Sequence, residues 1–228
     1  MKPRSKNIKQ VLKIVANQRR DTRYVVLLVI ASIIFLITYL QAISNSLFNS
    51  FERPLFYAIN QLPHALYPLF YAFTQFGGLG SIPIWIGIAW YLINKRAALT
   101  VFIGIFFGWF IANTAKTSVH RGRPGSLLND VNLFYGEKFS GFGFPSGHST
   151  VVATVVTILY FQVAPRYRKY LLGVALMVGL SRMYLGAHFP LDVVGGYALG
   201  AIVGSIILLV GGLSNNRLSA TKIKNSVD

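Results

Sequence analysis

Two of the four histidines lie in segments that could bind an anion and exchange a proton with it. His148 follows Pro145-Ser146-Gly147 and precedes the apolar run Ser149–Val163. These residue types are typical of a helix start, and a helix N-terminus offers free N–H groups and the positive end of its dipole to an anion. Ser146 would add a hydroxyl donor, and His148 would lie within reach for proton transfer. The alternative is a simple helix cap beside an interfacial histidine.

The second such histidine is His188, in the segment from Ser181 to Asp192. Gly186 is expected to end one helix and Pro190 to begin the next, so that His188 lies in the connection and Asp192 in the first turn. A carboxylate there can accept a hydrogen bond from Nδ1–H of His188, which leaves Nε2 as a nucleophile or base. The alternative is that Asp192 only complements the helix dipole and that His188 is an ordinary interfacial residue.

Three cations lie near the ends of different apolar runs: Lys116, Arg123 and Arg182. A charge so close to a membrane-spanning segment is costly and is a functional candidate by default. Lys116 would supply a point charge, and the two guanidinium groups would supply planar forks that match phosphate oxygens. The alternative for each cation alone is snorkelling to lipid head groups. If the three converge, they form an anion site.

The composition indicates which elements must position these groups. Hydrophobic residues make up 54% of the 228 residues and charged residues only 12%, against roughly 25% charged in a soluble domain. The chain therefore resembles neither a disordered protein nor an ordinary soluble enzyme. The absence of cysteine excludes disulfides, thiolate metal sites and a cysteine nucleophile. The apolar runs are Tyr24–Ile43, Leu79–Ile93, Ala97–Ala115, Ser149–Val163, Leu171–Leu185 and Pro190–Leu213.

The distribution of the 22 Lys and Arg residues, against 6 Asp and Glu, predicts the topology. Leu55–Gly78 is apolar but interrupted by polar residues and prolines. If this segment does not cross the membrane and the N-terminus is cytoplasmic, 16 of the 22 cations lie inside, as cytoplasmic loops prefer. We therefore predict an all-α bundle of six transmembrane helices with Leu55–Gly78 along the extracytoplasmic interface. The predicted parts are a basic cytoplasmic tail (1–23), the membrane domain (24–213) and a cytoplasmic C-terminal tail (214–228).

The remaining polar residues are expected to be ordinary. Arg121 and Lys138 are predicted to be solvated loop charges, the alternative being contact with a second phosphate of the substrate. His64 and His120 are predicted to be surface or interfacial imidazoles. A metal site is disfavoured because divalent ions bound through phosphate usually need carboxylates. Besides Asp192, the predicted outer loops hold only three acids, and no spacing resembles a zinc pair; these acids are Glu52, Asp130 and Glu137. We therefore expect no metal and no cofactor.

The candidate residues fall into three sequence pieces whose order is itself informative. They are Lys116-x6-Arg123-Pro124, then Pro145-Ser146-Gly147-His148, then Ser181-Arg182-x5-His188-x3-Asp192. Together they resemble the three-part signature of the type 2 phosphatidic acid phosphatase (PAP2) superfamily. The signature covers residues 116–192, and the predicted topology extends the resemblance over most of the chain. The basic tail lies outside it.

The resemblance implies a role for each residue. His188 would be the nucleophile that forms a phosphohistidine, Asp192 its orienting partner, and His148 the general acid that protonates the leaving oxygen. No metal would take part. The phosphate would be held by Lys116, Arg123, Ser146, the N–H of Gly147, and Arg182.

The expected function is metal-independent dephosphorylation of a lipid phosphate or diphosphate at the extracytoplasmic face of a membrane, most simply the bacterial plasma membrane. Undecaprenyl diphosphate is the preferred substrate. Phosphatidic acid, phosphatidylglycerol phosphate and a phosphotransferase reaction through the same histidine stay open. A transporter or scaffold is disfavoured because ionisable groups cluster at one face rather than at mid-membrane. Nucleic-acid binding by the basic tail is disfavoured because membrane topology explains its charge.

Overall fold

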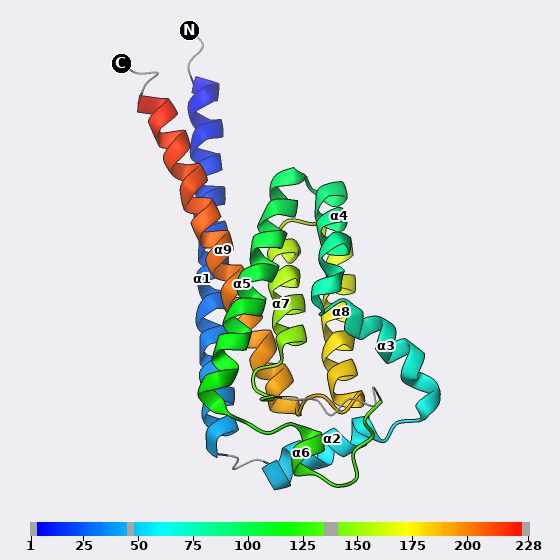
Figure 1. The fold of residues 1–228 in the computed structure, drawn as a ribbon. Helices are drawn as coiled ribbons and strands as arrows, with labels where there is room; N and C mark the ends of the chain where they lie inside the picture. The colour runs from blue at the N-terminus through cyan, green and yellow to red at the C-terminus, as the bar shows by residue number, and fades with distance from the viewer. Residues whose placement is uncertain (1–3, 45–47, 135–140, 225–228) are drawn as a thin grey trace.

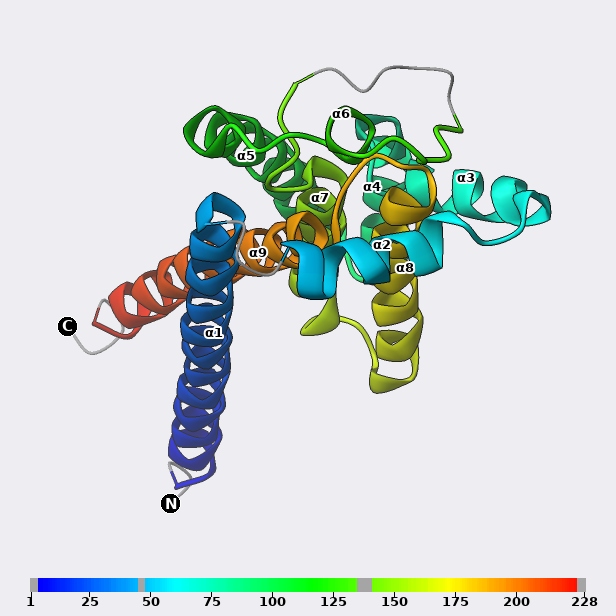
Figure 2. The same cartoon turned by 90° about the horizontal axis from the view of Figure 1, so that it is seen from below.

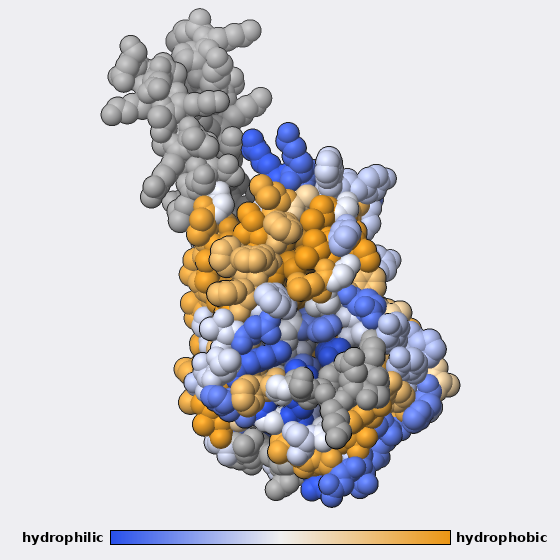
Figure 3. All heavy atoms as spheres, in the orientation of Figure 1, coloured by the Kyte–Doolittle hydropathy of each residue, from blue (hydrophilic) through white to orange (hydrophobic). Residues whose placement is uncertain are grey.

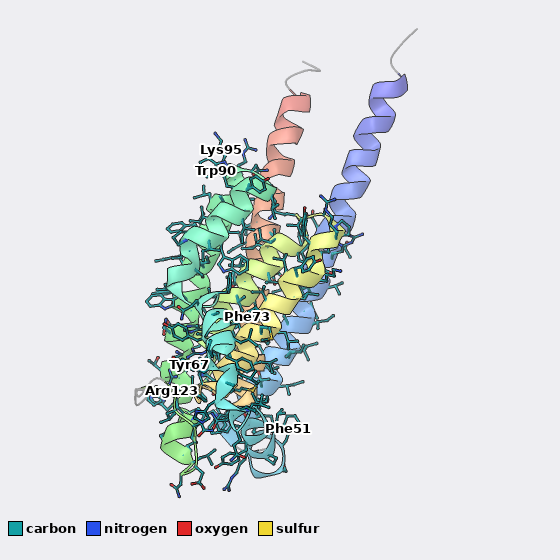
Figure 4. All side chains as sticks on the ribbon, turned by 90° about the vertical axis from the view of Figure 1, so that its right-hand side faces the viewer. Phe51, Tyr67, Phe73, Trp90, Lys95 and Arg123 are labelled. Atoms are coloured by element: carbon teal, nitrogen blue, oxygen red, sulfur yellow. The ribbon has the colours of Figure 1, made fainter. Side chains whose placement is uncertain are left out.

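The computed structural model describes residues 4–44, 48–134 and 141–224, and every regular element in these ranges is helical. The longer helices of these ranges have roughly aligned axes (Figures 1 and 4). Each contains or overlaps one of the predicted apolar runs: α1 (Arg4–Ser44), α4 (Ile82–Leu92), α5 (Lys95–Val119), α7 (Gly147–Tyr160), α8 (Pro165–Tyr184) and α9 (Pro190–Lys224). The predicted all-helical class is confirmed for the described part of the chain.

The shorter helices lie at one end of this bundle. The beginning of α1 and the end of α9 lie at the other (Figure 1). The segment Leu55–Gly78 contributes α2 (Arg53–Asn60), a 3₁₀ turn (His64–Leu66) and α3 (Tyr67–Gln75). A further short helix is α6 (Pro124–Leu127). Seen from below, α2 lies across the end of the bundle (Figure 2). Its position at a membrane interface remains a prediction.

A buried asparagine ties α2 to the end of α8. The side chain of Asn60 donates to the backbone oxygens of Tyr184 (2.9 Å) and Asn132 (3.0 Å), and its own oxygen accepts from the N–H of Asn132 (2.9 Å). These bonds satisfy a buried polar side chain, which would otherwise cost about 1–3 kcal/mol. They hold the short helices against the end of the bundle where α8 stops.

Length and hydropathy alone identify fewer spans than the six predicted. Within the described residues, three helices are long and apolar enough to cross a bilayer: Asp21–Ser44, Lys95–Leu127 and Pro190–Gly211. The pair His64–Gln75 and Leu79–Leu92 would form a fourth, bent by 67° at its break. Helix α7 is apolar but has only 14 residues, against the roughly 20 that a span needs. Several apolar helices are thus confirmed, and the number six stays a prediction.

The centre of the bundle is α7, which packs against α5, α8 and α9 (Figure 2). Its residues from Ser149 to Leu159 are all buried. Glycines on α9 allow the close approach, since a Cβ at Gly200 would lie 2.3 Å from the carbonyl oxygen of Thr150 and one at Gly204 2.7 Å from Cβ of Thr157. Small residues at such spacing are typical of tight helix pairs in membranes. This contact fixes the start of α7 beside the start of α9.

We expect Gly200→Ala to lower the thermal stability of the protein, because α9 must move away from α7 to admit the methyl group. Overpacking typically costs about 1–3 kcal/mol, and the better helix propensity of alanine returns at most about 1 kcal/mol. Thermal unfolding in detergent measures the change. The control is Gly211→Ala on the same helix, where a Cβ meets no atom within 4 Å. Equal losses in both variants would contradict the packing explanation.

Candidate active site

The predicted site residues come from helix ends that meet at one end of the bundle. Arg123 lies at the same end as Phe51, whereas Lys95 and Trp90 lie at the opposite end (Figure 4). On the face shown in Figure 3, hydrophilic residues gather around a hollow below an apolar band. The structure brings together residues from α5, α7, α8, α9 and the loops between them: Lys116, Arg123, Ser146, Gly147, His148, Arg182, His188 and Asp192.

The start of α7 has the expected cap and also faces a cation. Oγ of Ser146 accepts hydrogen bonds from the N–H (3.4 Å) and hydroxyl (3.0 Å) of Ser149, and the N–H of Ser146 donates to the backbone oxygen of Asp192 (2.9 Å). A Cβ on Gly147 would lie 3.9 Å from Nζ of Lys116. The helix cap and the anion site are therefore not alternatives, because one segment can serve as both.

His148 lies over the break between α3 and α4. A Cβ at Gly77 would come within 2.8 Å of Cβ of His148, and one at Gly78 within 3.5 Å of its Nε2. The two glycines thus make room for the imidazole. The positive charges of Arg182, Lys116 and Arg123 lie close enough to act on the imidazole of His148. The imidazole therefore lies within the cation cluster rather than apart from it.

His188 lies in the connection between α8 and α9 and is only 2% exposed. Its Nδ1 is 3.5 Å from Oδ2 of Asp192, which is longer than a formed hydrogen bond but within reach of a small ring rotation. Burial is the main reason why the pKa of His188 lies well below its ordinary value of 6.5. The positive charges of Arg123, Arg182 and Lys116 lower this pKa further. At neutral pH the imidazole is uncharged and keeps a nitrogen lone pair.

The two arginines that are predicted to hold the phosphate are anchored by neighbouring groups. Nη1 of Arg123 donates to the backbone oxygen of Ala187 (3.1 Å), next to His188. Nη1 of Arg182 donates to the hydroxyl of Thr74 on α3 (2.8 Å). Thr74 is 2% exposed, and sequence reasoning missed it because a threonine within an apolar segment carries no distinctive signal.

The prediction that Arg121 is a solvated loop charge is wrong. Its guanidinium is buried between two carboxylates: Nη1 lies 2.7 Å from Oδ1 of Asp192 and 3.1 Å from Oε1 of Glu52, and Nη2 is paired with Oε2 of Glu52. Arg121 is 4% exposed, and Glu52 and Asp192 are fully buried. A guanidinium can be buried when carboxylates and hydrogen bonds compensate its charge. Glu52, expected among outer-loop acids, belongs to this buried group.

The two remaining histidines lie at the surface, as expected. His120 is exposed and packs edge-on against Phe142, with ring centroids 4.5 Å apart. His64 is exposed and packs against Phe134 at 4.8 Å. Lys138 and Glu137 lie outside the described residues. Within those residues, no group of three or more His, Asp or Glu side chains could hold a metal ion.

The arrangement suits an anion that carries more than one negative charge. Three cations and a helix N-terminus converge from different elements onto two imidazoles, one of them buried beside a carboxylate. Fixed positive charges and N–H donors of this kind stabilise the equatorial oxygens in phosphoryl transfer, where catalysis rests mainly on positioning and electrostatics. An all-helical fold with apolar, bilayer-length helices and such a site defines an integral membrane protein equipped for phosphoryl chemistry.

Comparison with known proteins gives the family. The family model described as "PAP2 superfamily" matches residues 97–215, more than half of the chain. The chain therefore belongs to the PAP2 superfamily.

Solved structures agree with this assignment. The crystal structure of Aquifex aeolicus LpxE superposes with a TM-score of 0.62 at 30% sequence identity, covering 70% of this chain and 95% of that one. The crystal structure of the first transmembrane PAP2-type phosphatidylglycerolphosphate phosphatase from Bacillus subtilis gives 0.64 at 26% identity, covering 83% and 96%. The likeness thus extends beyond the matched segment.

Two relatives carry the names of phosphatases that act on lipids. The lipid A 1-phosphatase of Rhizobium johnstonii is 36% identical over 44% of this chain and 42% of its own length. The undecaprenyl-diphosphatase of Sulfolobus acidocaldarius is 33% identical over 52% of this chain and 59% of its own length. The chain thus spans about half the length of these two relatives.

Proposed function

We propose that this protein is a metal-independent phosphatase that removes phosphate from a membrane lipid phosphate or diphosphate through a phosphohistidine on His188. The observation that carries the proposal is the buried, uncharged imidazole of His188, with Nδ1 3.5 Å from Oδ2 of Asp192 and the charges of Arg123, Arg182 and Lys116 acting on it. An imidazole that is both unprotonated and surrounded by cations is suited to attack a phosphate dianion.

The reaction takes two steps. Nε2 of His188 attacks phosphorus and forms a P–N bond while the P–O bond to the lipid breaks, and His148 gives a proton to the leaving oxygen. Water then attacks the phosphohistidine, the P–N bond breaks, and a proton of the water passes to His148. A bound phosphate dianion favours the protonated imidazole of His148 at the start of the cycle. Asp192 stabilises the positive charge that develops on the ring of His188.

The phosphate oxygens would be held by the cations and by the start of α7. Arg123 and Arg182 are fixed through Ala187 and Thr74, respectively, so little side-chain entropy remains to be lost on binding. Lys116 lies beside Gly147, whose N–H is free to point at an anion because it belongs to the first turn of α7. These groups supply the charge compensation that a divalent metal supplies in other phosphatases.

The substrate is a lipid whose head group ends in phosphate or diphosphate. Undecaprenyl diphosphate is our first choice, and the Sulfolobus relative bears the name undecaprenyl-diphosphatase. Phosphatidylglycerol phosphate and phosphatidic acid are the alternatives, to which the Rhizobium relative's name adds lipid A 1-phosphate. The apolar band beside the hydrophilic hollow (Figure 3) would keep the lipid tail in the bilayer while the head group reaches the site.

The site would face the extracytoplasmic side, with both termini in the cytoplasm. Lys95 and Arg96 begin α5, and Arg166, Arg168 and Lys169 lie in the first turns of α8, both at the ends opposite to the site. Clusters of Lys and Arg in short loops favour the cytoplasmic side. The plasma membrane of a bacterium is the simplest location for such an enzyme.

We expect purified protein in EDTA to release phosphate from at least one of four lipids: undecaprenyl diphosphate, phosphatidylglycerol phosphate, phosphatidic acid and lipid A 1-phosphate. Their kcat/KM values would rank the substrates. The exposed His64 provides a control, since His64→Ala should match wild type. A strict need for Mg²⁺ would overturn the metal-free mechanism. Phosphoryl transfer only to an added lipid or sugar acceptor, without release to water, would identify a phosphotransferase.

A further inference from the structure

The carboxylate of Asp192 has two sides. Oδ2 faces His188 at 3.5 Å and accepts a hydrogen bond from the N–H of Phe189 (2.9 Å). Oδ1 faces away and accepts from Nη1 of Arg121 (2.7 Å). The oxygen beside the histidine is therefore held directly by Phe189, and Arg121 adds to its orientation through the other oxygen of the same group.

The guanidinium group of Arg121 in turn binds the carboxylate of Glu52. Both guanidinium Nη atoms bond to this carboxylate, and Oε1 of Glu52 also accepts from the N–H of Leu191 (3.0 Å), the residue before Asp192. The guanidinium lies over the ring of Phe189, 5.2 Å from its centroid. Glu52 therefore contacts the first turn of α9 both directly and through Arg121.

Glu52 comes from a different part of the chain than the signature. It ends the helical turn Phe48–Glu52, directly before α2, and lies outside residues 97–215, which match the family model. Its carboxylate is completely buried. A buried carboxylate that touched nothing functional would be costly compared with an apolar residue of the same size, so its position beside Asp192 calls for an explanation.

The charge balance among Asp192, Arg121 and Glu52 explains this position. Arg121 alone would neutralise Asp192 and weaken its effect on the ring of His188. With both carboxylates ionised, Asp192, Arg121 and Glu52 together carry one negative charge next to an uncharged imidazole. When Nε2 of His188 bonds to phosphorus, the ring becomes cationic, and the negative charge of the trio stabilises it in a buried site.

We propose that Arg121 and Glu52 are positioning residues for the catalytic histidine: Arg121 fixes the orientation of Asp192, and Glu52 offsets the charge of Arg121 so that Asp192 keeps its effect on His188. This inference rests on the proposed function, since it assigns these two residues to the same reaction. They act through Asp192, because their side chains contact each other, Asp192, Phe189 and Leu191.

The test is a double-mutant cycle with Asp192. Arg121→Lys keeps the charge but cannot bridge two carboxylates through parallel N–H groups. In the protein that retains Asp192 we expect kcat to fall about 10²-fold, since misplacing a catalytic group by about 1 Å has that effect. KM should change little because the residues that hold the phosphate are unchanged. In an Asp192→Asn background, the same substitution should change kcat less than about threefold, because the carboxylate it positions is gone.

Glu52→Gln provides a second, milder variant that keeps the shape of the side chain and most of its hydrogen bonds. It should lower kcat in the protein that retains Asp192 and have little effect on kcat in the Asp192→Asn background. Asn60→Ala is the structural control, since Asn60 is buried at the same end and its side chain bonds, among the residues that the structure describes, to backbone atoms of Asn132, Met183 and Tyr184. Any loss it causes should be equal in both backgrounds.

Two outcomes separate the hypotheses. Equal fold-losses from Arg121→Lys and Glu52→Gln with and without the Asp192 carboxylate would assign both residues to fold stability and overturn this inference, while an active wild type would leave the proposed function intact. If Arg121→Lys does not fold, the Glu52→Gln cycle decides alone. A folded wild type that releases no phosphate and forms no phosphohistidine would overturn the proposed function itself, and this inference with it.

Discussion

His188→Ala is expected to reduce phosphate release by at least about 10⁴-fold while the protein stays folded, because loss of a catalytic nucleophile has effects of this size or larger. The substitution removes both the bond-forming nitrogen and the group that Asp192 supports. Since His188 lies in the connection after α8 rather than within a helix, its truncation leaves the packing of α7 against α9 in place. Steady-state release of phosphate in detergent, with thermal unfolding measured alongside, checks both statements.

The same variant tests the intermediate. Wild type mixed with ³²P-labelled substrate and quenched in alkali should carry a label that is stable in base and lost in acid, as expected for a phosphohistidine. His188→Ala should carry none. A label that persists in this variant would assign the nucleophile to another residue, and turnover near the wild-type rate would remove His188 from the reaction.

The positions of the signature residues could be predicted because their local context is informative. Ser146 and Gly147 start a helix, and Gly186 and Pro190 separate two helices, so residue type alone locates the functional side chains at helix ends. The resemblance to one family then predicted that these helix ends converge on a common site. The structure places Lys116, His148 and His188 within one electrostatic cluster, although their chemical roles remain predictions.

The support behind the site could not be predicted in the same way. Glu52 and Arg121 are 69 residues apart, and each has a charged or turn-forming neighbour that is typical of a solvated loop, Arg53 and Gly122 respectively. Their burial is a property of the tertiary fold, in which the turn before α2 returns to the start of α9. One signal was available: with only six acids in the chain, an acid next to an apolar segment in a membrane protein needs a cationic partner.

Thr74 and the break after α3 illustrate the same limit. The segment Leu55–Gly78 is interrupted by polar residues and prolines, which predicts its division into short helices but not their direction. The structure turns α3 towards the site, where Thr74 binds Arg182 and Gly77 and Gly78 accommodate His148. Such contacts depend on side chains from distant segments, so a single sequence does not encode them in any local pattern.

Substrates with different leaving groups should distinguish the role of His148 from that of His188. A general acid contributes most when the leaving oxygen is a strong base, so we expect about a 10²–10⁴-fold loss with a lipid phosphate whose leaving group is an alcohol. With an aryl phosphate such as p-nitrophenyl phosphate, the leaving group needs no proton, and the first step should stay much closer to the wild-type rate. His188→Ala should instead lose activity on both substrates alike, because the nucleophile is needed whatever leaves.

The second step gives a further readout for His148. If this residue also accepts the proton of the attacking water, His148→Ala given the aryl phosphate should release one equivalent of nitrophenol in a burst and then stall with His188 phosphorylated. Rapid-quench measurement of nitrophenol and of the labelled protein would detect both events. A loss of equal size on lipid and aryl substrates, with no burst, would contradict the assignment of His148 as general acid. It would assign the imidazole over Gly77 and Gly78 to phosphate binding instead, because a binding residue serves every substrate that carries the same phosphate.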